Sequence, residues 1–154
     1  MMRALRTLWS DERGNSFIEM ALFAPILAAL LIGTVDLSRA YSAKLELEQA
    51  AQRVIERVQA SEYKTSDNST LQSEAASAAG TGATATAAAW LECNNNGSHL
   101  DYDSGSCANS TDPYARYFQI TVQKPFTPMF GGSIFPGAVN GVVTLRATAG
   151  VRTQ

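Results

Sequence analysis

The 154-residue sequence is short of cysteine, histidine and concentrated charge, and each shortage excludes a class of function. Two cysteines and the single histidine, His99, are too few to complete a zinc site. The formal net charge is -2, and no face or run concentrates enough lysine and arginine to collect phosphates. We therefore expect no metal, no cofactor and no nucleic-acid partner.

Catalytic constellations are also missing from the sequence. His99 lies in a polar stretch with no base or nucleophile paired to it, and a lone loop histidine is far more often a solvated side chain than a catalyst. No Ser/His/Asp, Cys/His or phosphate-loop pattern is present. The sequence therefore predicts that the protein is not an enzyme and has no catalytic residues.

Large apolar side chains are instead concentrated in one early block, residues 17–35, with the sequence FIEMALFAPILAALLIGTV. A helix needs about 20 such residues to cross a bilayer. Three arginines, Arg3, Arg6 and Arg13, precede the block and favour a cytoplasmic N-terminus. A cleavable secretory signal has a shorter apolar core, of roughly 7 to 15 residues, so the block predicts a retained membrane anchor.

Two residues within the block need an explanation of their own. An ionised carboxylate such as Glu19 costs a few kcal/mol in a membrane helix, so a plain signal anchor leaves it unexplained unless it reaches into the headgroup region. Pro25 has no N–H to donate to the carbonyl of Ala21, which predicts a kink or a loosened turn there.

A cut after Gly14 would make Asn15 the first residue of the mature chain and Glu19 the fifth. That spacing resembles the type IV prepilin signature, and residues 13–40 resemble the TadE-like pseudopilins of the tight-adherence (Flp) pilus system. The resemblance implies that the anchor lies in the lipid of a bacterial inner membrane and that a prepilin peptidase removes residues 1–14 on its cytoplasmic face. It also implies that other pilins and the pilus assembly machinery are partners.

The residue types suit this chemistry. Gly14 has no side chain, so an extended backbone can enter a protease cleft closely at that point. Cleavage would expose a new α-amino group, and Glu19 could pair with the amine of a neighbouring subunit, which offsets the cost of two charges in apolar surroundings. Asn15 departs from the aromatic residue that the commonest type IV pilins carry at this position.

The first helix is expected to continue to about residue 60, because residues 35–60 contain no proline or glycine and carry one apolar stripe. A second helix is expected from about Leu71, through an alanine-rich segment, residues 75–89, that could also be a flexible linker broken at Gly80 and Gly82. Alternation predicts two antiparallel strands at residues 117–123 and 142–151. Apolar residues in the loop between them, including Phe130, Ile134 and Phe135, would cover the core or contact another subunit.

Cys93 and Cys107 would lie beyond the membrane anchor, in an oxidising compartment, and flank a stretch rich in Asn, Gly and Ser. A disulfide between them is expected, the alternative being two unrelated thiols. Such a bond would contribute on the order of 3 kcal/mol by restricting the unfolded chain.

These expectations combine into an α+β fold. Residues 1–14 form a cytoplasmic leader, 15–35 the transmembrane part of the first helix, 36–62 its continuation, and 63–154 a periplasmic or extracellular α+β head. The predicted function is that of a minor pilin or pseudopilin in the assembly of a Flp-type pilus. The alternative is a signal-anchored periplasmic adhesin or ligand-binding domain that never enters a filament.

Overall fold

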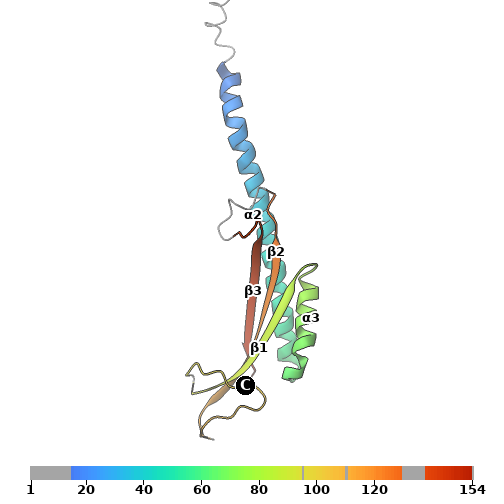
Figure 1. Ribbon diagram of the computed structural model, residues 1–154, viewed down its shortest axis with the longest axis vertical. Helices are drawn as coiled ribbons and strands as arrows, with labels where there is room; N and C mark the ends of the chain where they lie inside the picture. The colour runs from blue at the N-terminus through green and yellow to red at the C-terminus, as the bar shows by residue number, and fades with distance from the viewer. Residues whose placement is uncertain (1–14, 95, 110, 130–137, 154) are drawn as a thin grey trace, which may run out of the picture. The chain divides into compact units, whose positions relative to one another are not determined.

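The computed structural model describes residues 15–94, 96–109, 111–129 and 138–153 (Figure 1). The chain divides into two compact units, Met1–Ser38 and Arg39–Gln154. An α+β fold is confirmed, with a long first helix, a short second helix and an antiparallel sheet. In chain order the elements are α2 (Asn15–Ala60), the 3-10 turn η2 (Thr65–Asp67), α3 (Asn68–Ala78), β1 (Thr84–Cys93), β2 (Tyr114–Phe126) and β3 (Val143–Arg152).

Helix α2 has 46 residues, which agrees with the single long helix predicted from the sequence. Strong helix formers occupy its second half. The Nζ atom of Lys44 lies 3.5 Å from Oε1 of Glu48, one helical turn further on, and this salt bridge supports the helix. The helix ends where both the backbone N–H and the hydroxyl of Ser61 donate to the carbonyl of Arg57, at 3.2 and 2.9 Å. These bonds satisfy a carbonyl that the end of a helix would otherwise leave unpaired.

The sheet has the order β1-β2-β3, and both pairs are antiparallel. Its register places Thr86, Thr121 and Thr148 in one row across the three strands. The two predicted strands are confirmed as β2 and β3, although β2 extends three residues further at each end. The sheet has a third strand, β1, in a segment that the sequence predicted to be helix or linker.

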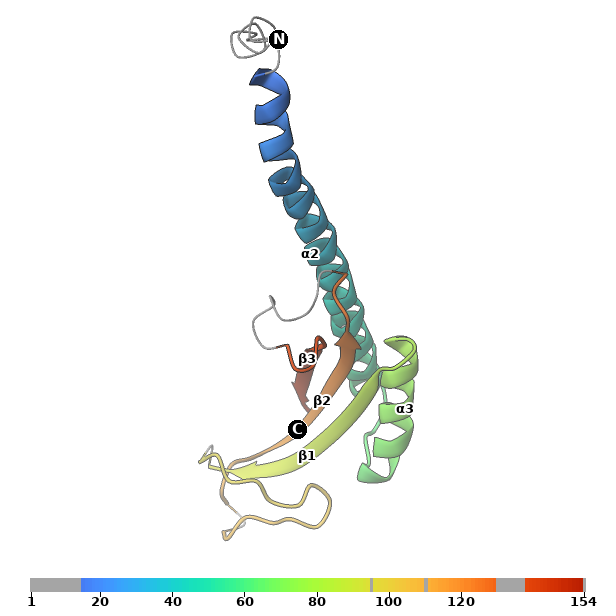
Figure 2. The ribbon, with the colours of Figure 1, turned by 45° about the horizontal axis from the view of Figure 1, so that its top comes forward.

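One face of the sheet forms the core of the second unit. Phe118, Ile120 and Val122 of β2 are fully buried, as the alternation predicted. The predicted apolar stripe of α2 is buried with them, and α3 runs beside β1 (Figure 2). Small side chains let these elements approach closely: Ala50, Ala51, Ala75, Ala79, Ala147 and Ala149.

The prediction for the alanine-rich segment was wrong after Ala78. Helix α3 stops there because Gly80 adopts a left-handed conformation, φ +84°, just past the C-cap residue Ala79, and its N–H donates to the carbonyl of Ser77 at 3.2 Å. From Thr84 the chain is strand β1, paired residue by residue with β2. Pairing in the sheet outweighs the intrinsic helix preference of alanine, which is a weak determinant beside tertiary contacts.

Candidate functional site

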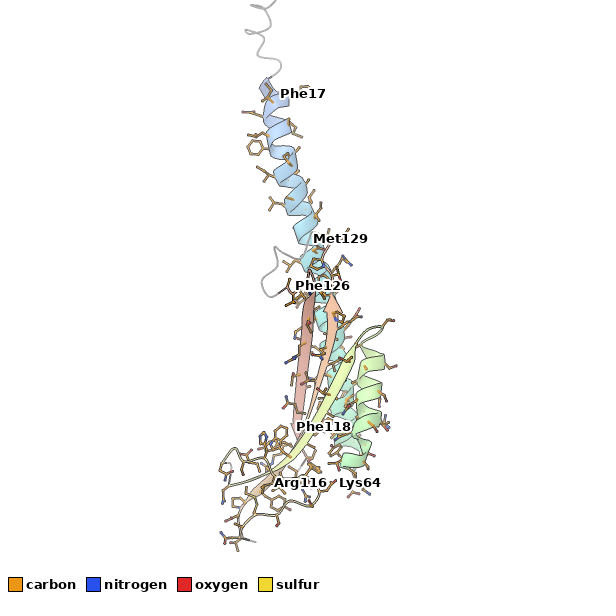
Figure 3. The ribbon with its side chains drawn as sticks, in the orientation of Figure 1. Phe17, Lys64, Arg116, Phe118, Phe126 and Met129 are labelled. Atoms are coloured by element: carbon orange, nitrogen blue, oxygen red, sulfur yellow. A yellow bond between two sulfur atoms is a disulfide. The ribbon has the colours of Figure 1, made fainter. Side chains whose placement is uncertain are left out.

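The apolar segment at the start of α2 exposes its side chains in the first unit. Phe17 is 82% exposed, and side chains project from successive turns of the helix (Figure 3). None of the most apolar stretch is buried within the structure, and the helix is long enough to cross a membrane. A helix that is apolar on all sides is covered by lipid or by other protein. The large apolar residues at least half exposed here are Phe17, Ile18, Met20, Leu22, Phe23, Ile26, Leu27, Leu30, Leu31 and Val35.

Polar groups in this segment find hydrogen-bond partners within the helix itself, as apolar surroundings require. The hydroxyl of Thr34 donates to the carbonyl of Leu30, at 2.8 Å, so it needs no partner outside the helix. Pro25 lies within α2, and the helix continues on both sides of it. The segment is therefore compatible with a single-pass membrane anchor.

Glu19 is the one ionisable residue between positions 17 and 35, and its side chain is exposed. It is the fifth residue counted from Asn15, which is the first described residue and is already helical. Gly14 and the rest of the predicted leader lie outside the described residues. The structure thus places the carboxylate of Glu19 on an open, apolar helix surface.

The β2–β3 connection is only partly described. Phe126, at the end of β2, lies under the guanidinium of Arg39, whose central carbon is 5.7 Å from the ring centroid. Met129 and Val139 are 68% and 72% exposed, so these two apolar side chains do not cover the core. The other apolar residues of the predicted contact loop, Phe130, Ile134 and Phe135, lie outside the described residues.

Cys93 and Cys107 are joined by a disulfide, with Cα atoms 5.7 Å apart. Cys93 is the last residue of β1, and the next residue, Asn94, donates its N–H to the carbonyl of Pro113 at 2.8 Å. Leu91 and Leu100 exchange two further backbone hydrogen bonds, at 2.9 and 3.0 Å. The loop that the sequence predicted between the cysteines is therefore fastened to the end of the sheet.

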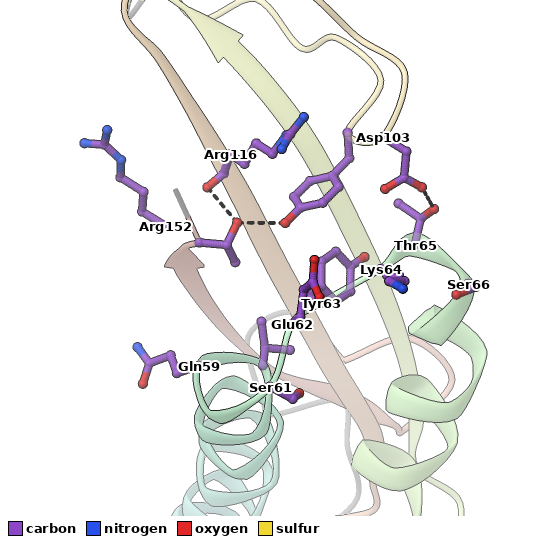
Figure 4. A pocket seen from close by; sticks show the side chains of 13 residues that line it. Gln59, Ser61, Glu62, Tyr63, Lys64, Thr65, Ser66, Asp103, Arg116 and Arg152 are labelled. Carbon is purple, nitrogen blue, oxygen red and sulfur yellow. Dashed lines mark hydrogen bonds between the residues drawn. The ribbon is translucent and has the colours of Figure 1, made fainter.

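A polar pocket of about 590 Å³ lies in the second unit, where this loop meets the segment after α2 (Figure 4). The hydroxyl of Thr65 donates to the carboxylate of Asp103 across it. Tyr102 and Thr153 share a hydrogen bond of 2.9 Å, and Thr153 also donates to the carbonyl of Arg116 at 3.2 Å. These bonds hold together four segments that are distant in the sequence.

Tyr63 forms the floor between this pocket and the core. Its ring centroid is 5.0 Å from that of Tyr102 and 4.8 Å from that of Phe118. Burial, followed by the neighbouring Tyr102, raises the pKa of Tyr63 to about 12. The hydroxyl therefore stays protonated at neutral pH and donates to the side-chain oxygen of Asn68, at 2.5 Å.

Among the described residues, no group of three or more His, Cys, Asp or Glu side chains is close enough to hold a metal ion. The features that stand out are an exposed apolar helix with one carboxylate and a disulfide-bonded α+β unit. They define a class of protein with a membrane-compatible N-terminal anchor and a folded domain of its own.

One known protein family matches the part of the chain that contains this anchor segment. Residues 14–55, which include the anchor segment, match the family model described as TadE-like protein. This confirms the resemblance predicted from residues 13–40. No curated protein and no solved structure matches the chain.

Proposed function

We propose that this chain is a minor pilin or pseudopilin that acts in the assembly of a tight-adherence (Flp) pilus after cleavage between Gly14 and Asn15. The observation that carries the proposal is the helix surface around Glu19: apolar, open on all sides, and interrupted by one carboxylate. In the bilayer, lipid covers this surface. In a filament, the equivalent segments of neighbouring subunits replace the lipid.

The carboxylate of Glu19 gives the assembly its register. Cleavage frees the amine of Asn15, and a neighbour's amine is a partner for a carboxylate that has no opposite charge within its own segment of sequence. An ion pair in apolar surroundings is favourable only when the two groups meet closely, so one axial offset between subunits is preferred. The prepilin peptidase, other pilins and the assembly machinery are the partners in this scheme.

The proposed topology follows the positive-inside rule. The arginine-rich leader stays in the cytoplasm, residues 15–35 span the inner membrane, and residues 36–62 continue the helix toward a periplasmic or extracellular head, residues 63–154. The disulfide supports this side of the membrane for the head, because such bonds persist in oxidising compartments. At 154 residues the chain is longer than the short Flp major pilins, which favours a priming, tip or minor position in the filament.

Substitution of Glu19 tests the register role. We expect Glu19→Ala to be cleaved normally but to enter sheared filaments at least about tenfold less than the wild type, because the neighbour's amine then has no partner. Glu19→Gln, which keeps the shape without the charge, should behave in the same way. The measurement is quantitative immunoblotting of sheared and membrane fractions from cells that express the native assembly system.

Met20→Ala is the matched control, since Met20 is the next residue, is 69% exposed and carries no charge. It should be cleaved and incorporated at close to the wild-type level. Incorporation of Glu19→Ala at the wild-type level would refute the register role, and absence of the wild-type chain from sheared filaments would refute the filament assignment.

A further inference from the structure

Polar groups at the end of β1 surround the peptide bond between Asn96 and Gly97. The N–H of Gly97 donates to the carboxylate oxygen Oε1 of Glu92 at 2.7 Å. The side-chain carbonyl oxygen of Asn96 accepts two hydrogen bonds from Ser98, one from its backbone N–H at 3.0 Å and one from its hydroxyl at 2.6 Å. A carboxylate is therefore bonded to the peptide nitrogen, and two donors are bonded to the neighbouring amide carbonyl.

The fold holds these groups in place. Glu92 belongs to β1, where it is paired with Ala115 of β2. The next residue, Cys93, forms the disulfide, and its carbonyl accepts a hydrogen bond from the N–H of Asn96 at 3.3 Å. Beyond Ser98 the backbone of Leu100 is bonded back to β1. Groups supported by strand pairing and a disulfide keep their mutual geometry better than groups on an unsupported loop.

Gly97 leaves its backbone nitrogen accessible. Its φ is +73°, and apart from its chain neighbours no heavy atom of the described residues lies within 4 Å of the place where a Cβ would be. A residue with a side chain would be strained there and would crowd the nitrogen. The bond from the N–H of Ser98 turns the side chain of Asn96 toward the residues that follow it. The nitrogen of Gly97 and the carbonyl carbon Cγ of Asn96 can therefore join in a five-membered ring.

We propose that the folded chain converts its own Asn96 to an acidic residue, with Glu92 as the general base. The carboxylate of Glu92 takes the N–H proton of Gly97, and the nitrogen bonds to Cγ of Asn96. Negative charge develops on Oδ1, where the two donors of Ser98 stabilise it as the donors of an oxyanion hole do. Glu92 then gives the proton to the amide nitrogen, which leaves as ammonia, and a cyclic imide remains.

Water completes the reaction, and it reaches the site because Asn96 is exposed. It adds to either carbonyl carbon of the imide and opens the ring, which leaves aspartate or isoaspartate at position 96. In total one water is consumed, one ammonia is released and one negative charge is gained. The new carboxylate lies close to that of Glu92, so repulsion weakens the bond to Gly97. The change occurs once per chain and accumulates with the age of the folded protein.

A second Asn-Gly pair in the same chain provides an internal comparison. Asn140 and Gly141 form the two-residue turn between the paired residues Val139 and Val142. Within the described parts of the chain, a carboxylate accepts from the N–H of Gly97 but none accepts from that of Gly141. We expect Asn96 to be modified at least about tenfold faster than Asn140 in the folded chain, because a positioned general base typically contributes about 10²–10⁴-fold. In denaturant and reductant the two rates should become similar.

Peptide mass spectrometry of the full-length chain, incubated in detergent at neutral pH, measures the amide-to-acid change at each asparagine over time. Glu92→Gln keeps the size of the side chain but removes the base, and it should slow modification of Asn96 at least about tenfold. Ser98→Ala removes one of the two donors to Oδ1 and should also slow it at least about tenfold. Glu56→Gln makes the same change as Glu92→Gln at an exposed position of α2 and is the matched control, with the wild-type rate expected.

Equal rates at Asn96 and Asn140 in the folded wild type would overturn the proposal, and this comparison needs no substitution that could disturb folding. An unchanged or higher rate at Asn96 in Glu92→Gln would also overturn it, because the carboxylate would then shield the N–H of Gly97 instead of removing its proton. All the reacting groups belong to the second unit, so either result leaves the pilin assignment of the chain untouched.

Discussion

Replacement of Phe118 by alanine is expected to lower the free energy of unfolding of the second unit by about 3–5 kcal/mol. Phe118 of β2 is completely buried in the same core cluster as the apolar stripe of α2, and its ring centroid is 4.8 Å from that of Tyr63. Truncation removes a large apolar side chain and leaves a cavity that fixed strand pairing on both sides prevents from collapsing.

Chemical denaturation in detergent, followed by circular dichroism, measures this effect. Phe17→Ala is the matched control, because the same side chain is removed at a position that is 82% exposed and lies in the other unit. Phe118→Ala should shift the unfolding midpoint markedly to lower denaturant, and Phe17→Ala should leave it unchanged. Equal midpoints for the two variants would show that the sheet does not pack on α2 as described.

Loss of the disulfide is expected to have the second large effect on the stability of the second unit. Cys93→Ser combined with Cys107→Ser should destabilise the second unit by about 3 kcal/mol, since the bond closes a loop with a sequence separation of 14 residues. The backbone bonds between Leu91 and Leu100 depend on the same closure, so the loop should also become more accessible to protease.

Reduction of the wild type provides the control for this pair of substitutions. The reduced wild type should unfold at the same midpoint as the double serine variant, and reductant should not affect the variant itself. If reductant leaves the wild-type midpoint unchanged, the bond is not present in the folded protein or does not stabilise it.

Periodicity predicted those elements whose apolar faces are built from large side chains. Phe118, Ile120 and Val122 alternate along the sequence, and all three are buried on one face of β2. Helix α2 was predicted to within a few residues because helix formers are continuous and glycine and proline are absent over its second half.

Small side chains carried too little information to assign β1. Ala85, Ala87 and Ala89 turn toward the core in alternation with exposed neighbours, but alanine is compatible with a helix, a linker or a strand by itself. The turn before β3 was detectable and was overlooked. Asn140 and Gly141 both have positive φ, 52° and 79°, between the paired residues Val139 and Val142, and Asn-Gly is a strong signal for such a two-residue turn.

The functional features formed by residues close together in the sequence were predictable, and those assembled by the fold were not. Gly14, Asn15 and Glu19 form a local motif, so spacing along the sequence was enough to nominate them. The stack of Trp90 on Tyr117 was not predictable, because the register of β1 and β2 alone brings the two rings together. The pocket beside Tyr63 likewise combines segments from four parts of the chain.

The junction between Gly14 and Asn15 is the most direct point at which to test the assignment as a pilin. The measurement is intact mass and N-terminal sequencing of the chain produced together with the prepilin peptidase of its own system. Wild-type protein should begin at Asn15, and Gly14→Leu should retain all of residues 1–14, because a branched side chain prevents close entry of the backbone into the protease cleft. A wild-type chain that still begins at Met1 would contradict the assignment as a processed pilin. Its mass would then differ from that of Gly14→Leu only by the difference between the glycine and leucine side chains.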